Sequence, residues 1–293
     1  LSMNELAKRL LAGTATGLLL QLSAYQAHAD HAEVNVTTSG PGIDLDTYAT
    51  ESSIHIASGV RIEDVWPDTD PGLQASTRAW TVTNDGTVAG GSNAVILDMG
   101  GMLLNGTTGV IESDPFGNAL RFSNGAATLD NYGQILGGTG AVSVLAGGSV
   151  TNRIGAVIQA NSNQSAVHLE GGTSRSINNS GVIENISTSG GFSAAISMRQ
   201  APGGSGNSSI VNAAGGVIRG GVRALDIYNM STSAFSLQNA GLIESTHGVV
   251  VGIDNVAVAN ITNSGSGIIR NLGTEAAITM NGLGNVYNWG AIT

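Results

Sequence analysis

The stretch ATLDNYGQILGGTGAVSV, residues 127–144, decides the fold. It opens on Leu129-Asp130-Asn131, an aliphatic residue followed by any residue and then Asn. It continues through Gly133 to Ile135 and ends in Ala141-Val142-Ser143-Val144. In both apolar segments, aliphatic residues alternate with other residues at a period of two, and Gly, Asn and Thr stand between the segments. The stretch therefore predicts short β-strands with one apolar face, separated by tight turns.

The aliphatic-x-Asn element recurs nine times from residue 80 onward. Its asparagines are Asn84, Asn105, Asn131, Asn152, Asn179, Asn212, Asn239, Asn263 and Asn288. Each Asn is followed by a glycine and then by an aliphatic residue, and these aliphatic residues are Val88, Ile111, Ile135, Ile158, Ile183, Ile218, Ile243, Ile269 and Ile292. The distance between the two alternates strictly between four and six residues. The alternation predicts a two-coil unit, with a tight turn in one coil and a turn two residues longer in the next.

A second element, usually Ala-aliphatic-x-aliphatic, follows in each of the eight complete repeats. The copies begin at Ala94, Ala119, Ala141, Ala166, Ala195, Ala224, Gly248 and Ala277. The variable position of this element is expected to face outward, and it reads Ile96, Arg121, Ser143, His168, Ser197, Asp226, Val250 and Thr279. This column contains a single acid and therefore gives no cluster of carboxylates.

No repeat can bury its apolar face alone, whereas stacked repeats can. The sequence therefore predicts an all-β protein, a right-handed parallel β-helix (solenoid) over residues 81–293, with Asn amide ladders between coils. A β-propeller or a sandwich is the competing architecture, but propeller blades need about 40 residues and an aromatic signature. Residues 30–80 depart from the repeat and are expected to form an atypical N-terminal capping segment with the first irregular coils. The repeats stop inside the ninth coil, which indicates a chain truncated at its C-terminal end.

The residue after the strand-starting aliphatic residue carries a further pattern. In the last four complete repeats it is Glu184, Arg219, Glu244 and Arg270, so the charge alternates in sign. Stacked coils would place these side chains next to one another as a charge ladder on the surface.

The first 29 residues have the organisation of a secretory signal peptide. A basic start (Lys8, Arg9) precedes the uncharged apolar run Leu10–Leu22, and Ala27-His28-Ala29 matches the small-x-small cleavage pattern. Cleavage is expected after Ala29. No second apolar segment follows that could form a transmembrane helix.

The charge composition limits which classes of partner the chain can bind. The net charge is −10, and residues 1–29 carry a net +1, so the remainder carries −11 with no lysine and nine scattered arginines. This excludes nucleic acid and anionic membrane surfaces as partners, because both require clustered positive charge. Cysteine is absent. Two interpretations stay open: a chain that crosses a second membrane unfolded gains from having no disulfides, and a long solenoid buries enough surface without them.

The tandem Ile-x-Asn-x-Gly-x-Ile pattern followed by Ala-Val-x-Leu, behind a signal peptide, resembles the passenger regions of Gram-negative autotransporters (type V secretion). The resemblance covers residues 81–293. It implies a passenger stalk at the cell surface or outer membrane, or a secreted one, with its own or a downstream outer-membrane β-barrel translocator as partner. The chain departs from the family because it stops at Thr293 without barrel strands, so the intact gene is expected to continue into them.

The sequence predicts no catalytic, cofactor-binding or metal-binding residues, and no cofactor. It contains no Gly-Asp-Ser, and Gly204-Ser205-Gly206 is interpreted as a flexible loop. The histidines of the mature part, His31, His55, His168 and His247, share no metal-ligand spacing. We therefore expect a non-enzymatic, adhesin-like surface protein whose ligand is a host or cell-surface glycan or protein. The alternative is a polysaccharide-acting β-helix enzyme, either a lyase or a hydrolase.

Overall fold

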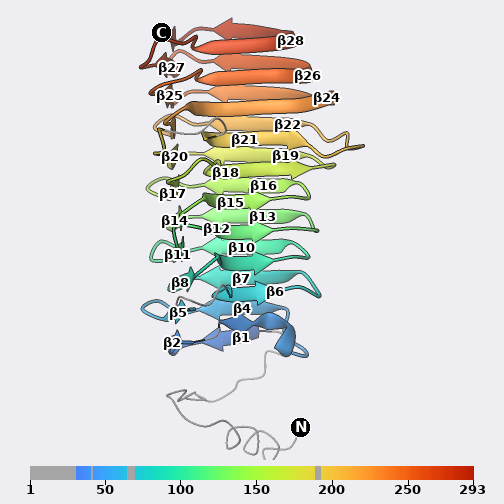
Figure 1. Cartoon of the computed structure of the whole chain (residues 1–293), viewed down its shortest axis with the longest axis vertical. Helices are drawn as coiled ribbons and strands as arrows, with labels where there is room; N and C mark the ends of the chain where they lie inside the picture. Colours follow the sequence, from blue (N-terminus) through green and yellow to red (C-terminus); the bar gives the residue numbers. More distant parts are fainter. Residues whose placement is uncertain (1–30, 41, 65–69, 189–192) are drawn as a thin grey trace, which may run out of the picture.

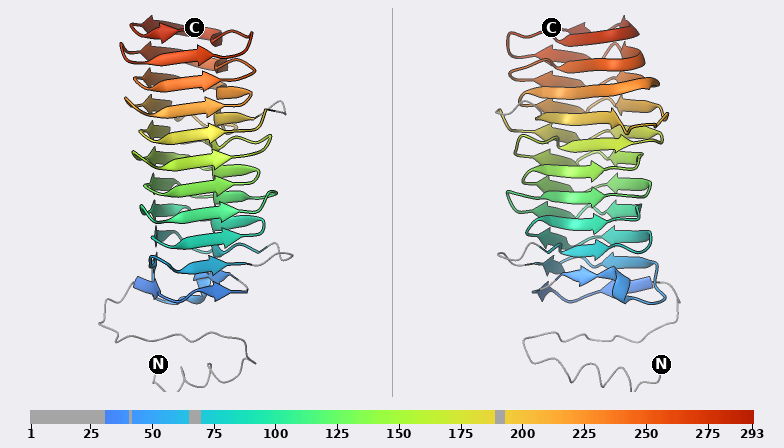
Figure 2. Two further views of the ribbon diagram at one scale, coloured as in Figure 1. Left: turned by 90° about the vertical axis from the view of Figure 1, so that its left-hand side faces the viewer. Right: turned by 45° about the vertical axis from the view of Figure 1, so that its right-hand side comes forward.

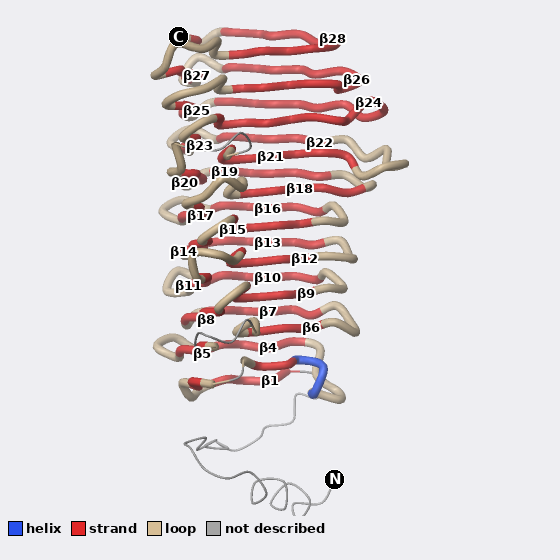
Figure 3. The backbone as a smooth tube through the Cα atoms, viewed as in Figure 1, coloured by secondary structure: helices blue, strands red, loops and turns tan. Residues whose placement is uncertain are grey.

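A computed structural model describes residues 31–40, 42–64, 70–188 and 193–293 of the chain. They form an all-β parallel solenoid of about ten turns, as the sequence predicts (Figure 1). Its one short helix, η1 (Leu45–Thr47), lies near the N-terminal end of the rod (Figure 3). The signal peptide predicted at residues 1–29 lies outside the described residues. Within them, no helix is long and apolar enough to cross a membrane.

Each turn contributes strands to three rows that run along the rod (Figure 2). The first row, which carries the repeated asparagines, contains β1 (His31–Val34), β4 (Ser53–Ile56), β7 (Trp80–Asn84), β10 (Gly101–Asn105), β13 (Ala127–Asn131), β16 (Gly148–Asn152), β19 (Arg175–Asn179) and β22 (Ser208–Asn212). The second row contains β3 (Ile43–Asp44), β6 (Leu73–Ala75), β9 (Asn93–Leu97), β12 (Asn118–Phe122), β15 (Gly140–Val144), β18 (Val167–Gly171) and β21 (Ala194–Gln200).

The third row forms a sheet of its own. It contains β2 (Thr38–Ser39), β5 (Arg61–Glu63), β8 (Thr87–Gly90), β11 (Val110–Ser113), β14 (Gln134–Gly137), β17 (Val157–Ala160), β20 (Val182–Asn185), β23 (Val217–Gly220), β25 (Leu242–Ser245), β27 (Ile268–Asn271) and β29 (Ala291–Ile292). In the last coils the second and first rows merge into the continuous strands β24 (Arg223–Asn239), β26 (Val251–Asn263) and β28 (Ile278–Asn288). Two of these bend at Asn229 and Asn255, whose left-handed backbone (φ 55° and 51°) Asn tolerates better than most residues.

The rows stack in register, and this register creates the core. Leu129 of β13 pairs with Leu103 below and Val150 above, and all three side chains are fully buried. The isoleucines of the third row stack in the same way, as Ile135 pairs with Ile111 and Ile158. Aliphatic columns therefore fill the interior, and burying them is the main driving force for stacking the repeats.

The predicted outward column of the second row is correct except at one position. Ser143, His168, Ser197 and Asp226 follow one another in register, but the residue paired with Asp226 is Gly252 rather than Val250. Val250 is wholly buried. The prediction was wrong here because valines occupy 249–251 consecutively, so that two registers satisfy the same apolar pattern.

The repeated asparagines form the amide ladder expected from the sequence. Each side-chain amide nitrogen donates to the Oδ1 of the Asn one coil further along, at 2.8–3.0 Å, from Asn84 through to Asn288. All are at most 1% exposed except Asn288 in the last coil. The Oδ1 of Asn84 is buried without a hydrogen-bond partner among the described residues, because the preceding coil has Ile56 at this place. The ladder is therefore a directed chain of hydrogen bonds with an acceptor left over at its first member.

The alternating turn lengths have a steric cause. The longer turn closes on itself, as in Gly106–Gly109, where the Gly109 amide donates to the Gly106 carbonyl at 2.9 Å. The glycine of the next, shorter turn packs against this loop: a Cβ on Gly133 would lie 2.2 Å from the Gly109 oxygen and 2.4 Å from the Gly106 oxygen. Gly181, Gly241 and Gly290 are placed in the same way. Short and long turns therefore nest in pairs, and two coils form the structural unit.

The predicted charge ladder is also confirmed. Glu184, Arg219, Glu244 and Arg270 pair in register along the third row. Arg219 contacts Glu184 at 3.1 Å and Glu244 at 2.6 Å, and Arg270 contacts the other oxygen of Glu244. Burial raises the pKa of Glu244, but the hydrogen bonds from Arg270 and Arg219 outweigh it and hold that pKa below its ordinary value. Glu244 thus stays ionised although its side chain is only 4% exposed.

Candidate functional site

A groove of about 550 Å³ crosses the second row of strands at β15, β18, β21 and β24. Its floor includes Ser143, His168, Ser197 and Asp226 of the predicted outward column, and adjacent strands are about 4.8 Å apart. One wall is the segment Asn163–Ser165, which comes just before β18, and Asn118 of β12 closes another side. The solenoid thus assembles polar side chains from five separate repeats into one site.

A second outward column enlarges this site, and the sequence analysis missed it. Two residues beyond the first column, Glu170 pairs with Arg199, and Arg199 pairs with Tyr228. Arg199 and Tyr228 line the groove. The predicted repeat element ends at its second aliphatic residue, but β18 and β21 continue beyond it to Gly171 and Gln200. Reading every second residue onward from the first column would have found these side chains.

His168 is the titratable group at the centre of the groove. Its side chain is 23% exposed, its Nδ1 lies 3.4 Å from the Ser197 hydroxyl, and its Nε2 lies 3.6 Å from the Glu170 carboxylate. Burial lowers the pKa of His168 from the ordinary 6.5, the charge of Arg199 lowers it further, and Glu170 opposes this in part. The imidazole is therefore neutral at pH 7 and offers one donor and one acceptor.

The carboxylates of the site are each paired with an arginine. Glu170 forms an ion pair with Arg199, and Asp226 accepts a hydrogen bond from Arg223 at 2.6 Å. Charge is thus balanced locally, and with a neutral His168 the groove presents hydroxyl, amide, imidazole and phenol groups rather than a strong field. Such a surface suits an uncharged or weakly charged polar ligand.

A buried arginine supports the groove from behind. Arg175 is 1% exposed and donates to the carbonyls of Gly171 (2.5 Å), Arg199 (2.9 Å) and Gly206 (2.5 Å) and to the Ser208 hydroxyl (2.8 Å). These bonds tie the ends of β18 and β21 to the loop that contains Gly204-Ser205-Gly206. That tripeptide connects β21 to β22 and does not line the groove.

A second groove, of about 580 Å³, lies over the third row, and its charged residues are engaged with one another. Arg61 contacts Glu63 of its own strand at 3.0 Å and Glu112 of β11 at 2.9 Å. These bonds balance the charge of the Arg61 guanidinium within the groove.

The remaining histidines lie elsewhere. His247 is in the turn after β25, where its Nδ1 lies within hydrogen-bond distance of Thr246 and of the Gly221 carbonyl. His31 and His55 lie side by side in the first two coils, on β1 and β4, with ring centroids 6.4 Å apart. The sequence analysis did not anticipate that stacking would bring these two together.

Comparisons with protein-family models, with curated proteins and with solved structures find no match for this chain.

Proposed function

We propose that this chain is the adhesin-like stalk of an autotransporter passenger and binds a glycan in the groove at His168 without cleaving it. The groove supports this proposal most directly, because it combines hydroxyl, amide and imidazole groups with a tyrosine ring on a rigid sheet. Ligand sites typically enclose about 300–1,000 Å³ and use a few well-placed polar groups for orientation. The groove also crosses several coils, so an extended oligosaccharide has room along the rod.

Two side chains are expected to carry most of the binding. Tyr228 supplies a ring whose face can pack against a sugar and a phenol that can hydrogen bond with it. The guanidinium of Arg199 is planar and multiply donating, and its side chain is 42% exposed. Local charge balance makes a neutral or weakly acidic glycan the best-matched ligand class.

A glycan array probed with the full chain tests this proposal. Tyr228→Ala and Arg199→Ala should each weaken binding to the best ligand at least about tenfold, a loss typical of binding hot spots. The matched controls are Tyr132→Ala and Arg153→Ala, a neighbouring Tyr and Arg outside the groove, with the guanidinium 5.2 Å from the ring centroid. Binding that falls equally in both pairs, or no binding to any glycan, would contradict the proposal.

One observation favours a second candidate, a polysaccharide lyase. A neutral imidazole at His168 can accept a proton, and Arg199 could pair with a uronate carboxylate. Removal of the proton next to the carboxylate would then expel the glycosidic oxygen, which takes up a proton, and leave an unsaturated sugar. Tyr228 lies two coils from His168, about 10 Å away at the usual strand spacing, so water would supply the proton that the leaving oxygen takes up. Incubation with alginate or pectin distinguishes the two: unsaturated products that disappear in His168→Ala would establish the lyase.

Export is the second part of the proposal, and it rests on the N-terminal pattern, the absence of cysteine and the solenoid. N-terminal sequencing of exported protein should give a mature chain that starts at Asp30. The exported protein should be accessible to protease on intact cells, in contact with an outer-membrane translocator. An uncleaved chain, or one retained inside the cell, would contradict export and would not bear on the proposed glycan binding in the groove.

A further inference from the structure

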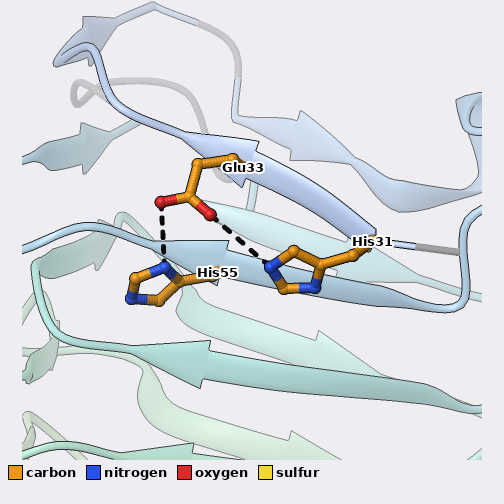
Figure 4. Close-up of side chains that lie close together, drawn as sticks. All are labelled: His31, Glu33 and His55. Atoms are coloured by element: carbon orange, nitrogen blue, oxygen red, sulfur yellow. Dashed lines mark hydrogen bonds and ion pairs between the residues drawn. The ribbon is translucent and has the colours of Figure 1, made fainter. Parts of the chain in front are cut away.

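We propose that His31, Glu33 and His55 form a divalent-metal site, with Zn²⁺ as the fitting ion, that joins the first coil to the second. The site is independent of the glycan groove and lies among the first strands, which do not line that groove. It is built from β1 and β4, which pair in parallel with Glu33 directly beside His55 (Figure 4).

The three side chains converge on a common space. One ligand atom from each lies within 4.8 Å of the others. Both rings point a nitrogen at the same carboxylate: Nδ1 of His55 is 3.0 Å from one Glu33 oxygen, and Nε2 of His31 is 3.5 Å from the other (Figure 4). Two imidazoles and a carboxylate are a donor set that Zn²⁺ takes in proteins, with water in a fourth position.

The second nitrogen of each ring is held by an outer partner. Nδ1 of His31 lies 2.9 Å from the Ser53 hydroxyl, and Nε2 of His55 lies 3.0 Å from the Asp85 carboxylate. In metal sites, a carboxylate or hydroxyl on the far nitrogen fixes the ring orientation and leaves the near nitrogen free to bind metal. Asp85 therefore acts as a positioning residue for His55. This arrangement of outer partners is the independent observation that separates a built site from a chance meeting of exposed side chains.

A modest adjustment completes the geometry. Ligand atoms around tetrahedral zinc are about 3.3 Å apart, given bonds of about 2.0–2.1 Å. The side chains of His31, Glu33 and His55 are 44%, 42% and 27% exposed, so their rotamers can close the remaining gap and solvent can reach the ion. Among the described strands, β1 pairs only with β4. A bound ion would therefore fasten a terminal strand to the stack and protect it from fraying.

Calorimetric titration of Zn²⁺ into the tag-free, chelator-treated full chain tests the proposal. We expect one site, weakened at least about tenfold in His31→Ala and in His55→Ala. Asp85→Asn should weaken it about 10- to 100-fold, as loss of an outer-shell partner does. His247→Ala is the control and should bind as the unmodified chain does, while circular dichroism verifies that every variant is folded.

Hydrogen exchange supplies a readout that does not depend on the variants. Zn²⁺ should slow amide exchange in β1 and β4 of the unmodified chain and leave β19 and β22 unchanged. Absence of a binding heat, or affinity that survives in both His31→Ala and His55→Ala, would overturn the site. The cluster would then be only a hydrogen-bonded group in which His55 bridges the carboxylates of Glu33 and Asp85.

Discussion

The first two coils and the nine that follow build the same turn from different residues. From β7 onward, an Asn ends each first-row strand and is buried in all but the last, whereas β1 and β4 have Val34 and Ile56 at the equivalent places. The turn lengths nevertheless continue the alternation. Thr38 follows Val34 by four residues, and Ile62, which pairs with Thr38 in the third row, follows Ile56 by six. Val60 closes the longer turn by donating to Ala57 at 3.1 Å, as Gly109 does to Gly106.

This comparison separates two contributions that coincide in the other nine coils. The nesting of short turns on long turns needs no asparagine, because Gly86 packs against the carbonyls of Val60 and Ala57 just as Gly133 packs against its own pair. The amide ladder is added from Asn84 onward and supplies directional hydrogen bonds. Turn nesting therefore sets the two-coil period, and the ladder strengthens the coils that carry it.

The largest loss of stability is expected when an Asn of the ladder is replaced by an aliphatic residue, as found at this place in the first two coils. Asn152→Ile leaves the Oδ1 of Asn179 buried without a partner. It also takes from the Asn131 amide its bond to residue 152, while the bonds to the Gly133 and Val157 carbonyls remain. Unpaired buried polar groups cost about 1–3 kcal/mol each, so unfolding free energy should fall by about 2–4 kcal/mol. Chemical denaturation measures it, with Asn161→Ile at an exposed site as the control. Equal losses in the two variants would show that the ladder contributes nothing.

The next effect concerns nesting and should be the same in both regions. Gly133→Ala and Gly86→Ala each drive a methyl group into backbone carbonyls, at 2.2 Å and 2.5 Å, so each should cost about 2–3 kcal/mol. Gly155→Ala is the control: it has open space around its Cβ but a φ of 81°, which costs about 1 kcal/mol. If Gly86→Ala were tolerated while Gly133→Ala was not, nesting would depend on the ladder after all.

A smaller effect is expected in the charge ladder. Arg219→Glu places three acids in adjacent coils, and since the arginine is 42% exposed the loss should be on the order of 1 kcal/mol. It should grow at low salt, because screening weakens exposed charge interactions. The double variant Glu184→Arg/Arg219→Glu should recover part of the stability. A loss independent of ionic strength would point to packing instead of charge.

The smallest effect lies in the first coils and depends on pH. Burial raises the pKa of Asp46, but side-chain and backbone hydrogen bonds from Ser76 and Thr77 together outweigh it and lower the pKa to about 2. Because the pKa in the folded protein lies below the ordinary 3.8, the ionised Asp46 stabilises the fold. This stabilisation is complete above pH 3.8 and is lost as the pH falls through about 2. Fluorescence of buried Trp80, with the other tryptophans replaced by Phe, should report the local loosening. In Asp46→Asn this step should be absent.

The fold was predictable because its determinants are local and repeat. The spacing of Asn131, Gly133 and Ile135 fixes a strand, a turn and the next strand, and eight further copies fix the stacking. One feature was predicted wrongly, for a physical reason. Three successive valines at 249–251 fit two strand registers equally well. Only the pairing of Ile253 with Ile227 and Met280 in the stacked coils fixes Ile253 as the inward residue.

The candidate site was predictable only in part. His168, Ser197 and Asp226 were predicted on one outward column. Glu170, Arg199 and Tyr228 lie beyond the repeated element, where the strand alternation continues but the residue types no longer repeat. His31 and His55 were judged by metal-ligand spacings within single elements. Their meeting depends on the 22-residue offset between Glu33 and His55, which becomes visible only once β1 and β4 are paired.

The decisive question is whether the His168 groove binds a glycan without cleaving it. Hydrogen exchange of the full chain with its best array ligand, followed by mass analysis of that ligand, answers it. We predict slower exchange in β18, β21 and the Arg223–Tyr228 part of β24, with the glycan recovered intact. Protection confined to other coils, or a glycan recovered in pieces, would contradict the claim.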